Sequence, residues 1–134
     1  MNITIDTTSR QPTVGLPDGV HEKIIFWQGD SLIINGLLSS APSVPLDLTS
    51  ATITWVLMDI NANVIDTLTV GSGITINSPT TAGSLAIVIP TFPTPGPYWD
   101  QLTVTILGVV ETYWVGEILF RATFTIDGLE GVAT

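Results

Sequence analysis

Short runs of β-branched and aromatic residues dominate the chain from Ile24 to about Ile126, and turn residues interrupt them at short intervals. Turn signals spaced roughly 8–12 residues apart are typical of β-sandwiches and β-barrels. No window combines a helical period with capping residues. Twenty threonines add to the β-branched content, which favours strands over helices. The pattern therefore predicts an all-β fold.

Strict alternation of apolar and polar residues shows which side chains should face the core. In the segment 51–57, Ile53, Trp55 and Leu57 share one face while threonines lie between them. Three further alternating sets are expected to point inward. They are Leu85, Ile87 and Ile89; Leu102, Val104 and Ile106; and, in one run over 117–126, Ile118, Phe120, Ala122, Phe124 and Ile126.

A chain of 134 residues is in the size range of one domain. We predict an immunoglobulin-like antiparallel β-sandwich of seven or eight strands over 22–134, with a jelly roll or a partly open barrel as the alternatives. Residues 1–21 contain two prolines and little periodicity, which indicates an extended N-terminal arm. This arm is expected to be a flexible tail or a strap across a neighbouring subunit.

The charge balance excludes some partners. Twelve acidic residues against three basic ones give a net charge of −9. Nucleic-acid binding depends on neutralising phosphates, and anionic membranes attract basic surfaces, so we expect neither nucleic acid nor membrane as a partner. No signal peptide or membrane span is predicted, because no apolar run is long enough. The chain has no cysteine, so packing must stabilise it without disulfides.

Residues capable of catalysis are scarce. His21 is the only histidine and belongs to the expected arm, where a general base lacks a fixed geometry. Asp59 and Asp66 flank a predicted hairpin and are interpreted as turn residues that bond nearby backbone. The segment 71–73, Gly-Ser-Gly, precedes a strand and is interpreted as a turn. We therefore expect no enzyme activity, no catalytic, cofactor-binding or metal-binding residues and no cofactor, with calcium at a subunit contact as an open alternative.

Two aromatic pairs, Tyr98-Trp99 and Tyr113-Trp114, are candidates for contacts with other molecules. Neighbours in a strand point to opposite faces, so one member of each pair is expected to be exposed. Such residues anchor protein interfaces or stack on sugars, and the alternative is that they cap the ends of the sandwich. The predicted protein-interface residues are Ile3, Ile5, Val14, Leu16, His21, Phe92, Tyr98, Trp99, Tyr113 and Trp114.

Four segments resemble a known family. They are FWQGD at 26–30, PLDLTSATITW at 45–55, GSLAIVI at 83–89, and GPY at 96–98 leading into Leu102 and Val104. In this order they resemble the immunoglobulin-like domain that begins the upper baseplate proteins of lactococcal-type siphophages and recurs in small phage virion proteins. The family domain is structural, so the resemblance implies no catalytic residue.

The resemblance implies a bacteriophage virion structural protein whose partners are other virion proteins, such as the major capsid protein or tail and baseplate subunits. Baseplate relatives continue into a helical linker, whereas this sequence ends at Thr134. We therefore expect a capsid decoration or cement protein on the outer surface of the virion, forming a homo-oligomer in the assembly. The alternatives are a baseplate, neck or tail accessory protein and a carbohydrate-binding adhesin module.

Overall fold

The computed structural model describes residues 2–8, 23–41, 44–126 and 129–132, and within these ranges the chain is built from strands with no α-helix. The elements are β1 (Asn2–Thr8), β2 (Ile24–Trp27), β3 (Ile33–Ala41), β4 (Val44–Pro45), β5 (Thr52–Asp59), β6 (Val64–Val70), β7 (Gly73–Ile76), the 3₁₀ turn η1 (Thr80–Ala82), β8 (Ser84–Val88), β9 (Gly96–Ile106), β10 (Val109–Arg121), β11 (Thr123–Ile126) and β12 (Leu129–Val132). The prediction of an all-β fold is confirmed.

One mixed sheet contains most of the strands, in the order β1-β3-β8-β7-β6-β5-β9-β10-β2, with β4 paired to β3. Three of its pairings are parallel: β1 with β3, β2 with β10, and β6 with β7. The prediction of an entirely antiparallel arrangement is therefore wrong. The first two strands cause most of this difference, because each joins an edge of the sheet alongside a strand that runs in the same direction.

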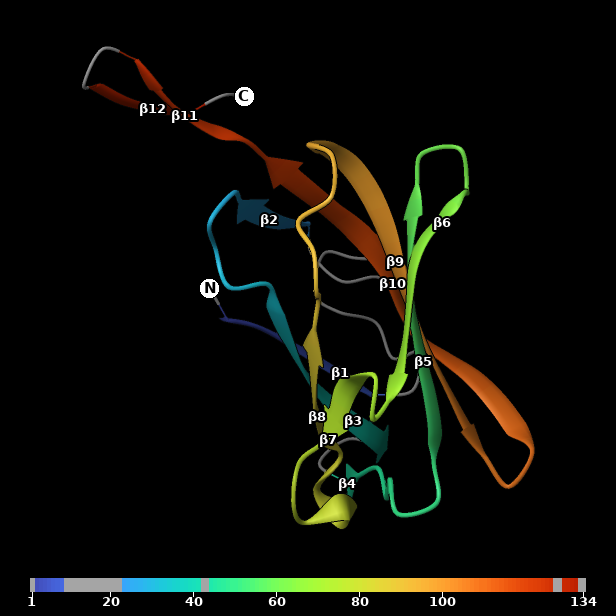
Figure 1. Cartoon of the computed structure of the whole chain (residues 1–134). Helices are drawn as coiled ribbons and strands as arrows, with labels where there is room; N and C mark the ends of the chain where they lie inside the picture. Colours follow the sequence, from blue (N-terminus) through green and yellow to red (C-terminus); the bar gives the residue numbers. More distant parts are fainter. Residues whose placement is uncertain (1, 9–22, 42–43, 127–128, 133–134) are drawn as a thin grey trace.

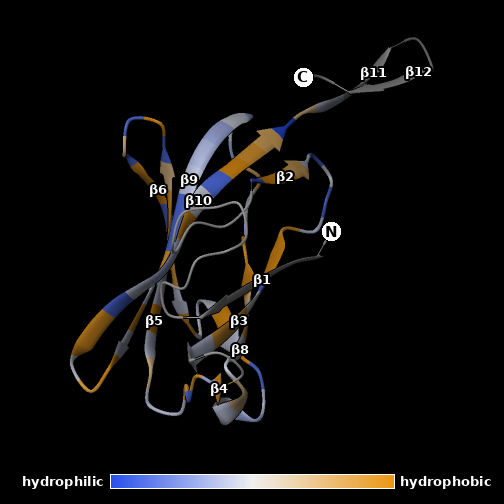
Figure 2. Ribbon diagram, turned by 180° about the vertical axis from the view of Figure 1, so that it is seen from behind, coloured by the Kyte–Doolittle hydropathy of each residue, from blue (hydrophilic) through white to orange (hydrophobic). Residues whose placement is uncertain are grey.

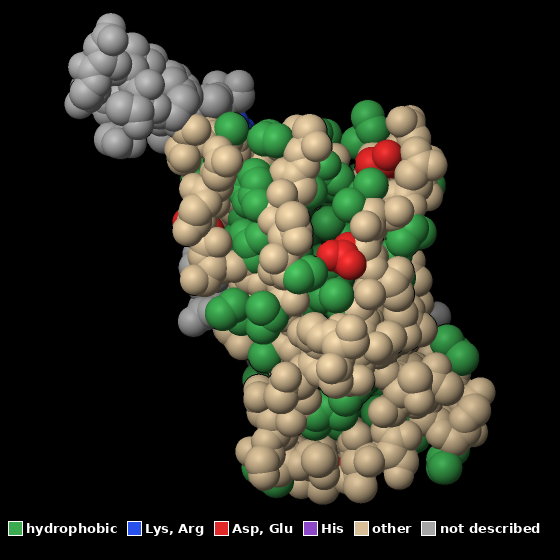
Figure 3. Space-filling view, in the orientation of Figure 1, with side chains coloured by type: hydrophobic (Ala, Val, Ile, Leu, Met, Phe, Trp, Pro, Cys, Tyr) green, Lys and Arg blue, Asp and Glu red, His purple; other side chains and the backbone are tan. Residues whose placement is uncertain are grey.

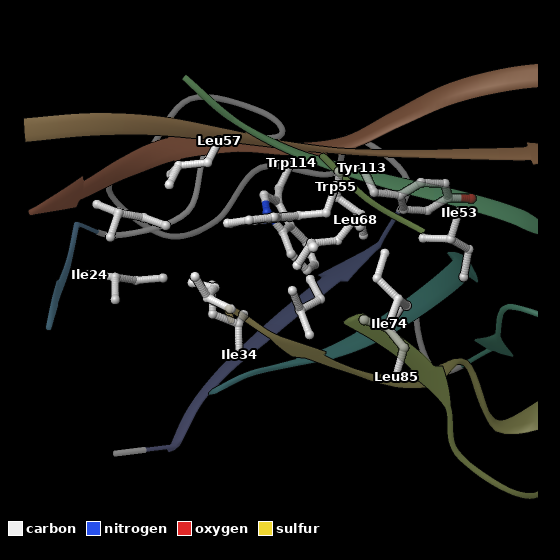
Figure 4. Close-up of a cluster of buried hydrophobic side chains, with 14 of the residues drawn as sticks. Ile24, Ile34, Ile53, Trp55, Leu57, Leu68, Ile74, Leu85, Tyr113 and Trp114 are labelled. Carbon is white, nitrogen blue, oxygen red and sulfur yellow. The ribbon is translucent and has the colours of Figure 1, made fainter. Parts of the chain in front are cut away.

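The sheet curls into a half-barrel, so that β3, β8 and β7 lie opposite β5, β9 and β10 (Figure 1). Side chains from both parts point into the space between them, as the close-up of the core shows (Figure 4). Trp55 and Ile34 are examples from the two parts, and both are fully buried. Full burial of a large apolar side chain contributes about 1.5–3 kcal/mol, so this shared core holds the curled sheet together.

The expected inward sets are largely correct. Ile53, Trp55 and Leu57 are buried on β5. The other buried members of those sets are Leu85, Ile87, Ile89, Leu102, Val104, Ile118 and Phe120, and Ile106 is partly buried against the core. The predicted single run over 117–126 is divided at Ala122: β10 ends at Arg121, and β11 pairs with β12 in a separate two-stranded sheet. Nothing in the alternation marks that change of partner.

Gly83 directly precedes β8 and lies beside Leu38 of β3. Its φ of 69° is in the left-handed region, and a Cβ at this position would overlap the carbonyl oxygen of Leu38. The Leu38 amide donates a hydrogen bond to the Gly83 carbonyl at 2.8 Å. Glycine is therefore required both by the backbone conformation and by the space available.

Candidate functional site

The centre of the core holds a polar cluster of two tryptophans and a carboxylate. Asp100 on β9 is fully buried, and it is the one buried charged residue among those that the structure describes. The indole nitrogens of Trp55 and Trp114 each donate a hydrogen bond to its Oδ2 at 2.8 Å. Both tryptophans are paired with Leu102, and Asp100 precedes Leu102 by two residues on the same face. The cluster therefore links β5, β9 and β10 through side chains as well as backbone.

Tyr113 and Trp114 are both buried, with 4% and 1% of their surface exposed. The expectation that one member of this pair is exposed is wrong. A β-bulge shifts the β9–β10 register between Thr112 and Trp114, so the two consecutive residues do not alternate across the sheet. Trp114 is thereby turned toward Asp100, to which its indole bonds, and Tyr113 lies beside Ile53 (Figure 4).

Tyr98 and Trp99 do alternate, as expected. Tyr98 is buried and donates a 2.6 Å hydrogen bond from its hydroxyl to the carbonyl of Thr94, whereas Trp99 is 42% exposed. Burial raises the pKa of the Tyr98 hydroxyl above its ordinary value, and the negative charge of Asp59 adds to this shift. Tyr98 therefore stabilises the fold through its buried ring and this hydrogen bond. Trp99 is the member of the pair that another molecule can contact.

Phe92 packs against the core and is not a free surface residue. Its ring meets that of Phe120 edge-on at 5.3 Å, and the Tyr98 ring makes a similar contact with Phe120 at 5.3 Å. Phe26 stacks on the same ring at 5.8 Å. These four aromatic residues form one cluster around the Phe120 ring, and Tyr98 is the member of it that belongs to a predicted aromatic pair.

The remaining predicted interface residues lie at the N-terminus. Ile3 and Ile5 belong to β1, where they pair with Ile34 and Gly36 of β3. Nothing is described of their side chains. Val14, Leu16 and His21 lie outside the described residues, so the prediction that they form contacts stays a prediction.

Three strongly exposed apolar residues lie at the end of the β9–β10 hairpin, and none of them is among the predicted interface residues. Leu107 is 91% exposed, Val109 62% and Val110 64%. Figure 2 shows this hairpin end in the colour of hydrophobic residues. Leu107 and Gly108 form a two-residue turn with φ values of 51° and 78°. Such turns favour Asn or Gly at both positions, so an apolar, fully solvated leucine with positive φ is unfavourable for the isolated domain.

A half-open groove of about 230 Å³ adjoins this hairpin. Its lining is mainly apolar, with Glu111 as the one acidic side chain. The lining residues are Ser40, Leu46, Val104, Ile106, Val109, Glu111 and Tyr113. Because Val109 belongs both to the groove and to the hairpin end, the two features form one continuous surface. We refer to Leu107, Val109, Val110 and the groove as the hairpin-end surface.

The second hairpin end, between β5 and β6, is organised by Asp59. Its Oδ1 accepts hydrogen bonds from the amides of Asn61 and Asn63, and its Oδ2 accepts one from the Asn63 side chain. The backbone and side-chain hydrogen bonds from Asn63 lower the pKa of the carboxyl. The interpretation of Asp59 as a turn residue is confirmed. Ile60, at the same turn, is 66% exposed.

Within the described ranges, no three His, Cys, Asp or Glu side chains come together in a group that could hold a metal ion. The same part of the chain also contains no helix of the length and apolarity needed to span a membrane. Hydrophobic side chains are instead spread over the visible side of the molecule, with isolated acidic groups between them (Figure 3). The arrangement is suited to contact with apolar surfaces.

Compared with known proteins, the chain matches no protein-family model and no curated protein.

Proposed function

We propose that this protein is a non-catalytic structural component of a bacteriophage virion, and specifically a decoration protein that binds the outer surface of the capsid. The four segments that resemble virion immunoglobulin-like domains support this proposal, together with the all-β fold that such domains require. A baseplate, neck or tail accessory role uses the same contact chemistry and is the alternative position within the particle.

The proposal includes an immunoglobulin-like arrangement of the strands. In immunoglobulin folds, a tyrosine near the start of one strand bonds back to backbone a few residues upstream, and a core tryptophan lies on a neighbouring strand. The Tyr98 hydroxyl bonded to the Thr94 carbonyl fits the first feature, and buried Trp55 on β5 fits the second. Asp100 follows Tyr98 by two residues, the spacing at which such domains carry a cysteine, and its bonds to Trp55 and Trp114 join it to the two neighbouring strands.

The observation that carries the functional proposal is Leu107. Asn or Gly at this turn position would relieve the positive φ and remove an apolar side chain from water. Residues that lower the stability of the isolated domain are expected at surfaces where a partner gains from them. Val109, Val110 and the adjoining groove extend the apolar area around Leu107. The hairpin-end surface is therefore assigned as the contact with the capsid.

Purified protein added to capsids that lack it tests this assignment. The wild-type chain is expected to bind in stoichiometric amounts and to raise the temperature at which the capsids break open. Leu107→Asn should reduce the affinity at least about tenfold, because it removes the central apolar contact. Ile60→Asn, at the opposite hairpin end, is the matched control and should bind as the wild type does.

The Leu107→Asn variant must also be as stable as the wild type, or more stable by about 0.5–1 kcal/mol, because the turn strain is relieved. This separates lost binding from lost folding. If wild-type protein neither binds the capsids nor changes their resistance to heat, the decoration role is wrong. If Ile60→Asn loses binding while Leu107→Asn retains it, the contact lies elsewhere on the molecule.

A carbohydrate-binding role is favoured by one observation, the 42% exposed ring of Trp99. Exposed indole faces stack on sugars, and the burial of Trp114 leaves Trp99 as the member of the two aromatic pairs suited to such stacking. A glycan that changes the tryptophan fluorescence of the wild type but not of Trp99→Ala would support it. An unchanged spectrum across a glycan panel would contradict it.

A further inference from the structure

The outer face of β6, β5, β9 and β10 has a composition unlike the rest of this acidic chain. Cross-strand pairing places four threonines side by side in one row: Thr69, Thr54, Thr103 and Thr112. Thr67, Val56, Gln101 and Val115 form the next row, and Val64, Met58, Trp99 and Glu117 the row beyond it. On the other side of the threonine row, Thr52 and Thr105 pair, and Val110 continues that row. We call these fifteen residues the threonine face.

Among these fifteen side chains, Glu117 is the one that carries a charge, and it lies on β10 at the border of the face. The chain as a whole has a net charge of −9. Two copies therefore repel each other unless they approach through a surface that holds few carboxylates. The threonine face is such a surface. Most of its area carries no charged side chain, so two copies that meet there do not place like charges opposite each other.

The side chains of the threonine face suit the packing of one sheet on another. Sheets stack about 10 Å apart when β-branched and other compact side chains interdigitate. Threonine and valine account for eleven of the fifteen residues, counted from the rows above as seven and four. The exposed indole of Trp99 lies beside Met58 in register and supplies the large aromatic anchor that interfaces favour.

The size of the face fits a weak symmetric contact. Its backbone positions span roughly 14 Å across the four strands and 20 Å along them, from strand spacings of about 4.8 Å and a rise of about 3.3 Å. These dimensions outline only about 280 Å² of backbone, well below the about 800 Å² per partner that standard interfaces bury, so the contact is expected to be weak and transient. A two-fold symmetric pair uses the same patch on both copies and needs no second type of surface.

We propose that the threonine face is a self-association surface, on which a second copy of this chain packs face to face through a two-fold axis. The contact uses the side of β5 and β9 that faces away from the core. It shares Val110 with the hairpin-end surface but does not involve Leu107 or the groove, so Leu107→Asn tests the proposed capsid contact separately. Dimerisation should be in the micromolar range and should strengthen as salt screens the net repulsion between copies.

Sedimentation velocity over about 5–500 µM protein, the range in which a small interface dissociates, provides the test. The variants are Thr54→Glu and Thr54→Lys, because Thr54 lies in the middle of the face. Each variant alone should raise the dissociation constant at least about tenfold, since like charges then face each other across the two-fold axis. An equimolar mixture of the two should restore association, because the charges become complementary.

Val88→Glu and Val88→Lys are the matched controls, since Val88 is 48% exposed on β8, outside the four strands of the face. Neither control should change the dissociation constant, alone or in mixture. Circular dichroism checks folding, and if the Thr54 variants fail to fold, the same pair of substitutions at Thr103 replaces them. A wild-type chain that stays monomeric throughout, or folded Glu and Lys variants that dimerise as well as the wild type, would overturn the proposal.

Discussion

The indole nitrogen of Trp55 donates a 2.8 Å hydrogen bond to Oδ2 of Asp100, and the carboxylate is completely buried. Trp114, on the strand at the other side of β9, donates a hydrogen bond to the same oxygen. A buried carboxyl group requires such hydrogen bonds, since an unpaired polar group in the core is strongly unfavourable. The strands β5, β9 and β10 are thereby joined at one oxygen atom. Substitution of the residue that carries it should therefore lower the free energy of unfolding considerably.

Replacing Asp100 by Ala should lower the free energy of unfolding by roughly 2–6 kcal/mol, because two buried indole donors each lose their acceptor at about 1–3 kcal/mol. Urea titration followed by circular dichroism measures this loss. In the Asp100→Ala background, Trp55→Phe should cost less than it does in the wild type, since its indole N–H has already lost its partner. Equal costs in both backgrounds would contradict the coupling.

Gly83→Ala should be among the most destabilising glycine substitutions, because a Cβ there meets backbone at Leu38. Gly108→Ala is the control: its φ of 78° is similar, but nothing lies within 4 Å of the added Cβ. The control should cost about 1–2 kcal/mol for the left-handed conformation alone. Gly83→Ala should cost about 1–3 kcal/mol more through overpacking. Thermal unfolding of both variants tests the difference, and similar losses would count against the close approach of β3 and β8.

Tyr98→Phe should destabilise the fold by about 0.5–1.5 kcal/mol at neutral pH, since it removes the hydrogen bond to the Thr94 carbonyl. The pKa of Tyr98 is raised above its ordinary value of 10.0 by burial, so the folded state retains the proton that the unfolded state releases. Its contribution is fully present below pH 10.0 and is lost as the pH rises above that value toward the folded pKa.

Urea midpoints at about pH 8 and about pH 11, on either side of the ordinary tyrosine pKa, measure this effect. The gap between wild type and Tyr98→Phe should narrow at the higher pH. A constant gap would show that the hydroxyl titrates as it does in the unfolded chain.

Asp59→Ala tests a stability contribution that is lost at low pH, whereas that of Tyr98 is lost at high pH. Hydrogen bonds from Asn63 hold the pKa of this carboxyl below its ordinary value of 3.8, so the charged form is favoured in the folded state. Its contribution is fully present above pH 3.8 and is lost as the pH falls below that value toward the lower folded pKa. The stability difference between wild type and Asp59→Ala should therefore shrink on acidification. Asn77→Ala removes an uncharged turn side chain and should show no such narrowing.

Local alternation was sufficient to predict much of the core. Thr52, Thr54 and Val56 separate Ile53, Trp55 and Leu57, and the latter three are all buried. The period of a strand is set by its own backbone, so inward positions can be predicted without knowing which strands are neighbours. The alternative that the aromatic pairs belong to the fold was also considered, and Tyr98 packs edge-on against Phe120. Phe92 was predicted as an interface residue, but it packs against Phe120 as well.

The bulge at Tyr113 and Trp114 was missed, although the sequence contains a sign of it. Trp114, Ile118 and Phe120 follow one alternating frame, whereas Glu111 and Tyr113 belong to the other. Two frames that meet in one strand require an extra residue between them. The hairpin-end surface was missed for a different reason: the predicted inward set ends at Ile106, no role was predicted for the residues around Leu107, and the turn geometry is what exposes them.

Parallel pairings leave no local pattern in the sequence. β2 lies parallel to β10, with Ile24 paired to Ile118 and Trp27 to Arg121. No feature of residues 24–27 indicates a parallel rather than an antiparallel partner. The same holds for β1 and β3. Long-range pairing depends on which edges the rest of the sheet leaves open, which alternation within a strand does not reveal.

Both edges of the large sheet come from the first 27 residues, with β1 at one end of the strand order and β2 at the other. During synthesis, β1 can meet β3 as soon as residue 39 has left the ribosome, whereas β2 has no partner until Arg121 has emerged. An apolar segment that contains Ile24 and Phe26 must therefore wait, unpaired, for most of the time that the ribosome needs to make the domain. We therefore expect the pairing of β2 with β10 to be among the last steps of folding.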